Sequence, residues 1–262
     1  MLCDYHSHTR FSDGRGEPRD FARAALAAGF AEIACTDHAP FPEVRSNWHM
    51  KLEDLPRYVE SVEQARREAV GVKILLGLEL DYIPELQAHF RAIQQRYDWD
   101  FLLGSVHYVG DWNIDNPDFI EQWRACDVDA VWETYFKLQT DAVRTGLYDA
   151  MAHPDLAKKF DYHPKRDPRP WYERFLRACA ETGVAIEIST AGLRRPCREV
   201  YPSLDMLKLA RLLGVAITFG SDAHLTQDIG RDFNKAFALA REAGYTQFAR
   251  FEKRRRSFAP IP

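Results

Sequence analysis

Two histidines lie two residues apart near the start of the chain, in the segment DYHSHTRFSDG at residues 4–14. On an extended strand, His6 and His8 project from the same face because side chains alternate with a period of two. Imidazoles bind first-row divalent metal ions, and a carboxylate such as that of Asp13 can bind or bridge them. A lone HxH pair also occurs in ordinary strands, so the rest of the chain must decide between a metal site and a structural role.

Further histidines and carboxylates stand at or just beyond the ends of short apolar runs. Together with the first three residues, the set comprises His6, His8, Asp13, Asp37, His38, Glu79, His107, His153, Asp222 and His224. Taken singly, the TDH segment at 36–38 could be a capped turn, and His153 before Pro154 could simply end a strand. Glu79 is harder to explain in this way, because an unpaired charge in the run VKILLGLEL would be very costly to bury. A cation is the simplest partner that removes this cost.

The set contains no cysteine, which argues against a structural zinc knot. Histidine and carboxylate ligands with open positions are typical of metal-dependent hydrolysis.

Seven short apolar runs alternate with seven longer amphipathic segments. Strands are expected at 2–8, 31–37, 72–80, 100–108, 148–153, 184–190 and 215–222, and helices at 18–29, 52–70, 85–97, 118–145, 170–182, 203–213 and 232–243. The near-continuous apolar character of the runs is typical of parallel strands covered on both faces. Seven strand–helix units favour a closed or nearly closed α/β barrel. A doubly wound open sheet is the alternative, but the first turn, HTRFSDGRG, has no GxGxxG pattern. In a barrel the C-terminal strand ends meet at one rim, where the polar set would gather.

The composition restricts the class of protein. The chain has 262 residues and a formal net charge of −4, so the whole molecule offers no broad attraction to nucleic acid. No apolar run reaches the roughly 18 residues of a membrane span, and the first residues lack the pattern of a signal peptide. Five scattered cysteines without a CxxC pair predict a reducing cytoplasm. The basic run EKRRRSF at 252–258 is interpreted as a solvated tail, with a phosphate-binding arm as the alternative.

Seven segments resemble, in order, the motifs of the polymerase-and-histidinol-phosphatase (PHP) superfamily. They are HSHTRFSDG, CTDHAPFP, GLELDYI, GSVHYV, AHPDLAKKF, STAGLRRP and FGSDAH, and they extend over nearly the whole chain. The segments GLELDYI, KKF and STAGLRR resemble the histidinol-phosphate phosphatase branch in particular. The resemblance implies one PHP-type catalytic domain over 1–262, folded as a distorted (β/α)7 TIM-like barrel with its metal site at the C-terminal strand ends.

The resemblance also implies a site for two or three divalent ions of zinc, iron or manganese. His6, His8 and Asp222 would bind the first ion. Glu79 would bridge it to a second ion held by His107 and His153, and a third would be bound by Asp13, His38 and His224. Many members of the superfamily have a histidine where this chain has Asp13, and a carboxylate can select a harder metal.

Catalytic roles are implied for Asp37, His38, Glu79 and Asp222. Asp37 would orient the His38 ring or help to protonate the leaving oxygen. Lys159 and Arg194 would anchor the phosphate, with Lys158 and Arg195 as neighbouring alternatives. Separately, its position in the long loop after the second strand suggests that Trp48 packs on an imidazole and helps to cover the substrate.

The expected activity is hydrolysis of a small phosphate monoester, L-histidinol phosphate, by a hydroxide that bridges two ions. No nucleic acid or membrane partner is expected, and a homo-oligomer is compatible with the sequence. Two alternatives stay open at this point. The first is a nucleotide phosphoesterase or 3′–5′ exonuclease, and the second is a protein that stores metal or regulates without catalysis.

Overall fold

The computed structural model describes residues 1–43 and 46–262, and its centre is a sheet of seven parallel strands. In spatial order these are β1 (Leu2–Asp4), β2 (Phe30–Cys35), β3 (Lys73–Asp81), β4 (Phe101–Ser105), β7 (Ala150–Met151), β8 (Ala185–Ser189) and β9 (Ile217–Gly220). Each strand pairs in parallel with the next. The seven parallel strands expected from the alternating pattern are therefore confirmed.

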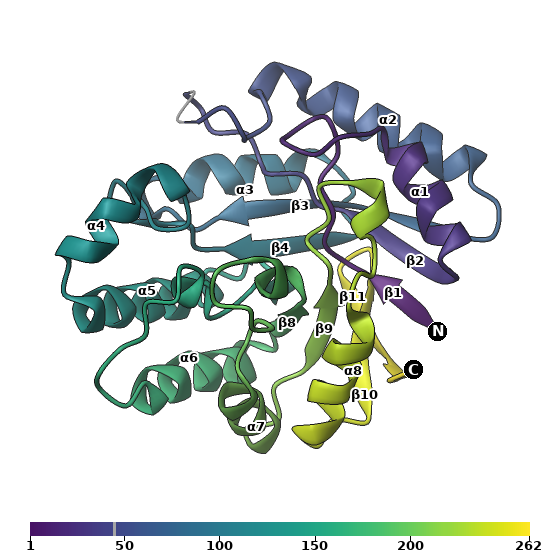
Figure 1. Cartoon of the computed structure of the whole chain (residues 1–262). Helices are drawn as coiled ribbons and strands as arrows, with labels where there is room; N and C mark the ends of the chain where they lie inside the picture. The colour runs from purple at the N-terminus through teal and green to yellow at the C-terminus, as the bar shows by residue number, and fades with distance from the viewer. Residues whose placement is uncertain (44–45) are drawn as a thin grey trace.

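The sheet curls until its two outer strands meet. Just beyond β1, the Tyr5 N–H donates to the Phe219 carbonyl oxygen at 2.9 Å, and the His8 N–H donates to the Ala223 carbonyl oxygen at 2.8 Å. These bonds join the first segment of the barrel to the last (Figure 1). The structure is thus a nearly closed barrel of seven parallel strands, as expected, and not an open sheet.

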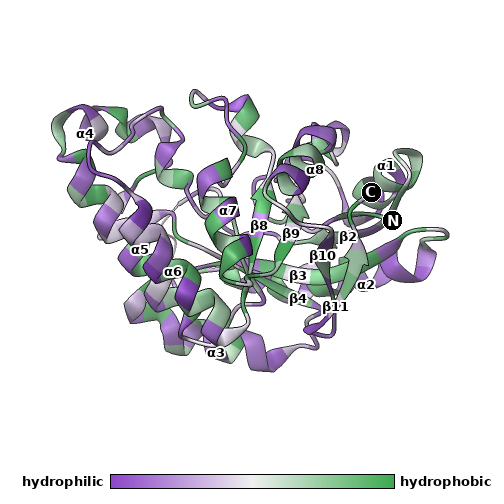
Figure 2. Ribbon diagram, turned by 90° about the horizontal axis from the view of Figure 1, so that it is seen from below, coloured by the Kyte–Doolittle hydropathy of each residue, from purple (hydrophilic) through white to green (hydrophobic). Residues whose placement is uncertain are grey.

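Helices surround this barrel (Figure 1). They are α1 (Pro18–Ala27), α2 (Leu55–Glu68), α3 (Gln87–Arg96), α4 (Ile120–Ala125), α5 (Val128–Val143), α6 (Arg169–Thr182), α7 (Leu204–Leu212) and α8 (Phe233–Glu242). Short 3-10 turns lie at Leu52–Asp54, Pro84–Leu86, Pro117–Phe119, Leu156–Lys158, Ala191–Arg194 and Thr226–Asp228. Figure 2 shows mainly hydrophobic strands at the centre and helices that alternate between hydrophilic and hydrophobic residues, as expected for helices with one face on a core.

The segment 118–145, expected as one helix, is divided in the structure. Asp127 interrupts it, because its carboxylate accepts hydrogen bonds from the backbone N–H groups of Asp129 and Ala130 and starts α5. A small hairpin of β5 (Tyr108–Val109) and β6 (Trp112–Asn113) also precedes this region. This hairpin brings the segment 113–118 to the C-terminal end of the barrel, where it lines a cavity.

The opposite, N-terminal end of the barrel is covered by an antiparallel hairpin of β10 (Gln247–Glu252) and β11 (Arg255–Pro260). The Phe251 ring packs on Phe101 at a centroid distance of 4.8 Å. Arg254 Nε donates to the Asp149 carboxylate at 3.1 Å. Residues 252–258 are therefore not a tail, because backbone pairing and the Arg254–Asp149 ion pair hold them in the hairpin, although most of their side chains are exposed to solvent as expected.

Across residues 1–43 and 46–262, none of the helices combines the length and the apolar character that crossing a bilayer requires.

Candidate metal centre

The C-terminal ends of the strands carry a dense cluster of imidazoles and carboxylates. His6 and His8 follow β1, His38 follows β2, Glu79 lies in β3, His107 follows β4, His153 follows β7, and Asp222 and His224 follow β9, while Asp13 comes from the loop after β1. Within the described residues, four overlapping groups of these side chains have ligand atoms within 4.8 Å of one another. The structure thus brings together all nine side chains of the expected ligand set.

Glu79 lies at the centre of the cluster and is 1% exposed. Its Oε2 atom is 3.0 Å from His38 Nδ1, 3.3 Å from His6 Nε2 and 3.6 Å from His8 Nε2. One carboxylate oxygen therefore faces three imidazole nitrogens, an arrangement that suits an ion shared by these groups.

The other Glu79 oxygen, Oε1, faces the opposite side of the cluster. It lies 3.1 Å from His153 Nε2 and 3.7 Å from His107 Nε2. Each Glu79 oxygen thus has its own set of histidines, which is the geometry that a carboxylate bridging two cations needs. Asp222 joins the first set, since its Oδ1 atom lies 3.2 Å from His8 Nε2.

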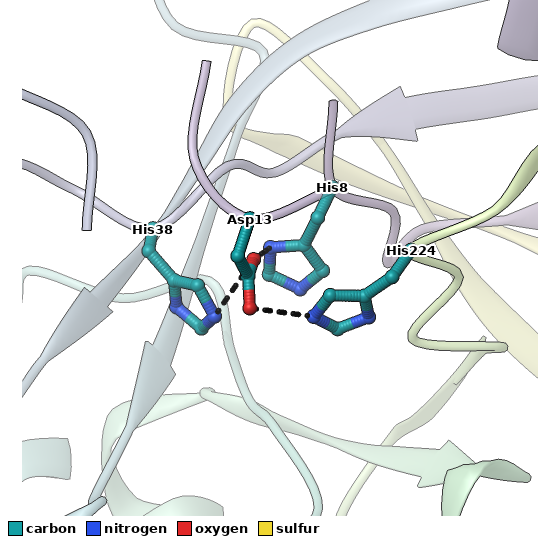
Figure 3. Close-up of side chains that lie close together, drawn as sticks. All are labelled: His8, Asp13, His38 and His224. Carbon is teal, nitrogen blue, oxygen red and sulfur yellow. Dashed lines mark ion pairs between the residues drawn. The ribbon is translucent and has the colours of Figure 1, made fainter. Parts of the chain in front are cut away.

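A third set surrounds Asp13 and is drawn in Figure 3. Asp13 Oδ2 lies 3.1 Å from His224 Nε2, and Asp13 Oδ1 lies 3.8 Å from His38 Nε2 and 3.9 Å from His8 Nδ1. The expected grouping placed Asp13 with His38 and His224, whereas the structure adds His8 to them. This set is the most open one, because the side chains of Asp13 and His224 are 31% and 29% exposed.

Several polar atoms at the centre of the cluster have no hydrogen-bond partner within residues 1–43 and 46–262. They are His6 Nε2, His8 Nε2, His38 Nδ1 and Glu79 Oε2, all fully buried. Buried polar atoms without partners are costly and need an explanation. Imidazole nitrogens and carboxylate oxygens are the donor atoms that zinc, iron and manganese accept, so the residues fit divalent metal ions.

Mutual attraction keeps the acids of the cluster ionised. Burial by itself raises the pKa of Glu79, but the imidazoles of His6, His38 and His107 outweigh it and hold that pKa well below its usual range. In the same way, burial raises the pKa of Asp222, and His6 and His8 bring it well below normal. A carboxylate that is ionised at all ordinary pH values is ready to bind a cation.

Glu187 is a residue of the candidate site that the sequence did not reveal. It lies in β8, is fully buried, and its Oε1 atom is 2.8 Å from His6 Nδ1, while Oε2 accepts a 2.9 Å hydrogen bond from the His153 backbone N–H. Gly220 makes room for it, because a Cβ atom there would lie 1.9 Å from Glu187 Oε1. A usable signal existed in VAIEIST, since Glu187 is an isolated acid in an apolar run, like Glu79.

Asp81, two residues after Glu79, was also missed. Its Oδ1 atom is 2.8 Å from His107 Nδ1, and its Oδ2 atom is 2.9 Å from His49 Nε2. A carboxylate on the far nitrogen of a ligating histidine fixes the ring orientation and the tautomer. Asp81 can fix the His107 ring in this way, and its contact with His49 holds the loop that carries His49 against the end of β3.

Trp48 lies in the same loop and packs on the imidazoles of two histidines of the chain. Its ring stacks on His49 at a centroid distance of 3.6 Å and contacts His38 edge-on at 4.4 Å. Trp48 also lines the cavity above the cluster. Its role in covering the substrate stays a prediction.

Two of the candidate ligands have an unusual backbone conformation. His153 has φ of 27° and Asp222 has φ of 52°, both in the left-handed region. Such residues cost on the order of 1–3 kcal/mol each and concentrate at active sites. Buried carboxylates support both positions, because Glu187 accepts from the His153 N–H and Asp4 accepts from the Ser221 N–H at 2.9 Å.

A cavity of about 260 Å³ opens above the cluster and has two cations in its wall. Its lining includes Asp13, His38, Trp48, Glu79, His107, Asn113, Asp115, Asp118, His153, Lys159, Arg195, Tyr201, Asp222 and His224. Lys159, expected as a phosphate anchor, is thus brought to the site, as is Arg195, the neighbouring alternative to Arg194.

Two other expected anchors have partners inside the protein instead of facing the cavity. Arg194 donates through Nη2 to the Ser221 carbonyl oxygen at 2.7 Å and is not among the described residues that line the cavity. Lys158 is buried, with Nζ 2.9 Å from the carboxylate of Asp155 and 2.9 Å from that of Glu199. Both cations have internal partners, so their charges support the fold beside the site.

Asp37 also differs from its expected position beside the His38 ring. Its carboxylate is fully buried and accepts hydrogen bonds from the backbone N–H groups of Thr9 and Ser12 and from both hydroxyl groups. Burial raises the pKa of Asp37 to about 6, although these hydrogen bonds oppose the rise. Asp37 therefore holds the loop that carries Asp13, and it lies outside the cavity lining as far as the described residues go.

Comparisons with known proteins show to which family the chain belongs. A model of the PHP domain matches residues 4–191. The chain is 38% identical over 247 residues to a probable histidinol-phosphatase of Deinococcus radiodurans, covering 93% of this chain and 94% of the relative. The chain therefore belongs to the PHP family.

Within that family, the chain is similar to histidinol-phosphatases. The histidinol phosphate phosphatase of Lactococcus lactis, whose crystal structure contains zinc, L-histidinol and phosphate, superposes with a TM-score of 0.81 at 25% identity over 98% of both chains. A putative histidinol phosphatase from Listeria monocytogenes shares the fold, with a TM-score of 0.80 at 23% identity over 89% of this chain and 99% of that one.

Proposed function

We propose that the protein is a metal-dependent phosphomonoesterase that hydrolyses L-histidinol phosphate to L-histidinol and phosphate. The observation that carries this proposal is the cluster of six imidazoles and three carboxylates beneath a cavity that also contains Lys159 and Arg195. The similarity to the Lactococcus lactis enzyme, which binds zinc, L-histidinol and phosphate, supports the same substrate.

The proposed site holds two or three divalent ions, with zinc, iron and manganese as candidates. The side chains around the two Glu79 oxygens would bind two of the ions. The set around Asp13 would bind a third ion. Bound ions would supply positive charge for the phosphate and a water acidic enough to act as a nucleophile near neutral pH. The greater exposure of Asp13 and His224 suggests that the third position is the first to lose its ion.

The chain's own residues prepare the site for this chemistry. Glu187 and Asp81 hold the rings of His6 and His107 in place through their far nitrogens. Lys159 and Arg195 are the proposed phosphate-binding cations, and an arginine guanidinium can bind two phosphate oxygens at once. Trp48 is proposed to cover the substrate and exclude water from the reacting phosphate.

The remaining features of the proposal concern the whole chain. Residues 1–262 form a single catalytic domain whose partner is a small phosphate monoester, without nucleic acid. A reducing compartment, the cytoplasm, is proposed because all five cysteines are free, and four of them, at positions 3, 35, 179 and 197, are buried.

The test combines elemental analysis of protein purified without added metal with a panel of four substrates. The panel contains L-histidinol phosphate, an aryl phosphate, a 3′,5′-bisphosphonucleotide and a short oligonucleotide. The expected result is bound zinc, iron or manganese and the highest kcat/KM for L-histidinol phosphate. Faster turnover of either nucleotide would refute the proposed substrate, and full metal content without any turnover would refute an enzymatic role.

A further inference from the structure

One wall of the cavity carries a carboxylate that no proposed metal position uses. Asp115 follows the β5–β6 hairpin and lines the cavity. Two hydrogen bonds fix this segment, since the Ile114 N–H donates to the His107 carbonyl oxygen at 2.9 Å and the Asp115 N–H donates to Asn113 Oδ1 at 3.2 Å. Asp115 is therefore held in a defined position relative to His107 and to the metal cluster.

The partner of Asp115 is the proposed phosphate anchor. Asp115 Oδ2 lies 2.9 Å from Lys159 Nζ, and only 21% and 11% of the two side chains are exposed. A carboxylate at this place weakens the binding of any phosphate monoester that brings only negative charge, because like charges in a partly buried site repel strongly. Phosphate binding alone therefore does not explain why a carboxylate lies beside the proposed phosphate anchor.

An ammonium group on the substrate would explain the position of Asp115. In L-histidinol phosphate the ammonium group is two carbons away from the ester oxygen, so a cation and an anion lie close together in one molecule. The Lys159–Asp115 pair presents the complementary charges 2.9 Å apart. When the substrate binds, the Lys159–Asp115 ion pair can separate. Lys159 then pairs with the phosphate and Asp115 pairs with the ammonium group, so each buried charge keeps a partner of opposite sign.

We propose that Asp115 determines substrate specificity by binding the ammonium group of a 2-aminoalkyl phosphate. The inference rests on the proposed phosphomonoesterase function and deepens it, because it names the group that the site recognises. A phosphate monoester without an ammonium group leaves Asp115 next to a dianion and is bound less well. Discrimination therefore comes from an unfavourable contact with the wrong substrate as well as a favourable one with the right substrate.

The test compares L-histidinol phosphate with its deamino analogue, 3-(imidazol-4-yl)propyl phosphate, using the metal-loaded full chain. Wild-type protein is expected to prefer the amino substrate by roughly 10- to 100-fold in kcat/KM, the scale of one hydrogen bond to a charged group. Asp115→Asn is expected to remove most of this preference by slowing the amino substrate while the deamino analogue is hydrolysed equally well or faster. Asp115→Glu, which keeps the charge, should retain part of the preference.

Asp111→Asn is the matched control, because it removes the same charge from the exposed turn of the same hairpin, outside the cavity lining as described. It is expected to leave the ratio of the two kcat/KM values unchanged. An equal loss of both activities in Asp115→Asn would show that Asp115 only positions Lys159, and would overturn the proposal.

The wild-type measurement distinguishes the two proposals even if Asp115→Asn does not fold. Hydrolysis of both phosphates at equal kcat/KM would overturn the role of Asp115 and leave a phosphomonoesterase. Hydrolysis of neither phosphate would overturn the proposed function, and the role of Asp115 with it.

Discussion

Glu187 is a charged side chain with no exposed surface, and it contacts two candidate ligands at once. Its hydrogen bond to His6 Nδ1 leaves Nε2 directed at Glu79 and Asp222, where a metal ion would be bound. A carboxylate in this position makes the imidazole a better ligand and fixes its tautomer. Glu187 would thus act on a bound ion through His6, without contacting the ion.

Glu187→Gln is expected to weaken metal binding by roughly 10- to 100-fold, because the amide is neutral and cannot hold His6 in the same way. The measurement is the metal dissociation constant from competition with a chromogenic chelator. Glu173→Gln, on the exposed face of α6, is the control and should bind metal like the wild type. Unchanged affinity in Glu187→Gln would contradict the role assigned to this residue.

Sequence reasoning reached most of the candidate ligands but not the residues behind them. Glu79 was found because an acid in an apolar strand demands a partner, and the same argument applied to Glu187 would have found it too. Arg194 and Arg195 could not be distinguished, since adjacent residues at the end of a 3-10 turn point in different directions and their neighbours decide which one faces the cavity.

Among the elements, the β10–β11 hairpin closes the N-terminal end of the barrel through a buried acid. Arg250 pairs with the Glu32 carboxylate, and the Tyr5 hydroxyl donates to Glu32 Oε2 at 2.6 Å. Burial raises the pKa of Glu32, but Arg250 and Tyr5 outweigh burial and lower it overall. Folding is therefore favoured most when this carboxylate is ionised.

This shift predicts how stability depends on pH. Because the pKa of Glu32 is lower in the folded chain than in the unfolded one, its stabilising contribution is complete at neutral pH and is lost as the pH falls below about 4.3, the ordinary glutamate value. Glu32→Gln should be less stable than wild type at pH 7, and the difference in unfolding free energy should shrink as the pH falls below about 4.3, as measured by urea unfolding. Glu242→Gln, at an exposed position of α8, should follow the wild-type curve. If the unfolding free energies of Glu32→Gln and wild type differ by the same amount at all pH values, ionisation of Glu32 is not the source of the difference.

The loop that carries Trp48 allows substrate binding to be tested separately from the chemical step. The Trp48 ring contacts His38 and lines the cavity. Trp48→Ala should therefore raise KM for L-histidinol phosphate by roughly tenfold, the scale of one lost aromatic contact, with a smaller effect on kcat. Phe258→Ala, on the distant β11 strand, is the control and should leave both constants unchanged. If Trp48→Ala keeps wild-type KM and kcat, the proposed cover is wrong.

The pattern of apolar runs was sufficient for the seven strands but not for the hairpin that closes the barrel. Parallel strands are continuous apolar segments, which periodicity detects well. The segment 252–258 is dominated by charge, and its contacts with Asp149 and Asp100, which are far away in the sequence, hold the hairpin on the barrel. Contacts of this kind depend on the completed barrel and leave no local signal.

For the molecule as a whole, closing the barrel concentrates charge and unpaired polar atoms at one end. His6 and Asp222 meet because backbone hydrogen bonds join the segment after β1 to the end of β9 and the residues that follow it. The barrel therefore forms its active-site end at a cost in free energy, since the buried nitrogens and the Glu79 oxygen lack partners within the described chain. Ions that bind only the folded chain offset this cost and shift the folding equilibrium.

Removal of metal should for this reason lower the midpoint of thermal unfolding. A free metal concentration 100 times the dissociation constant stabilises the folded state by about 2.7 kcal/mol per site, which for a chain of this size is a shift of roughly 5–10 °C. The measurement is calorimetry of chelator-treated protein before and after zinc is restored. Glu79→Gln should respond much less to zinc because it loses the shared ligand, whereas Glu121→Gln, at an exposed position of α4, should respond like the wild type. Equal midpoints with and without metal would mean that the cluster satisfies its own charges, and the case for bound ions would then lose its physical basis.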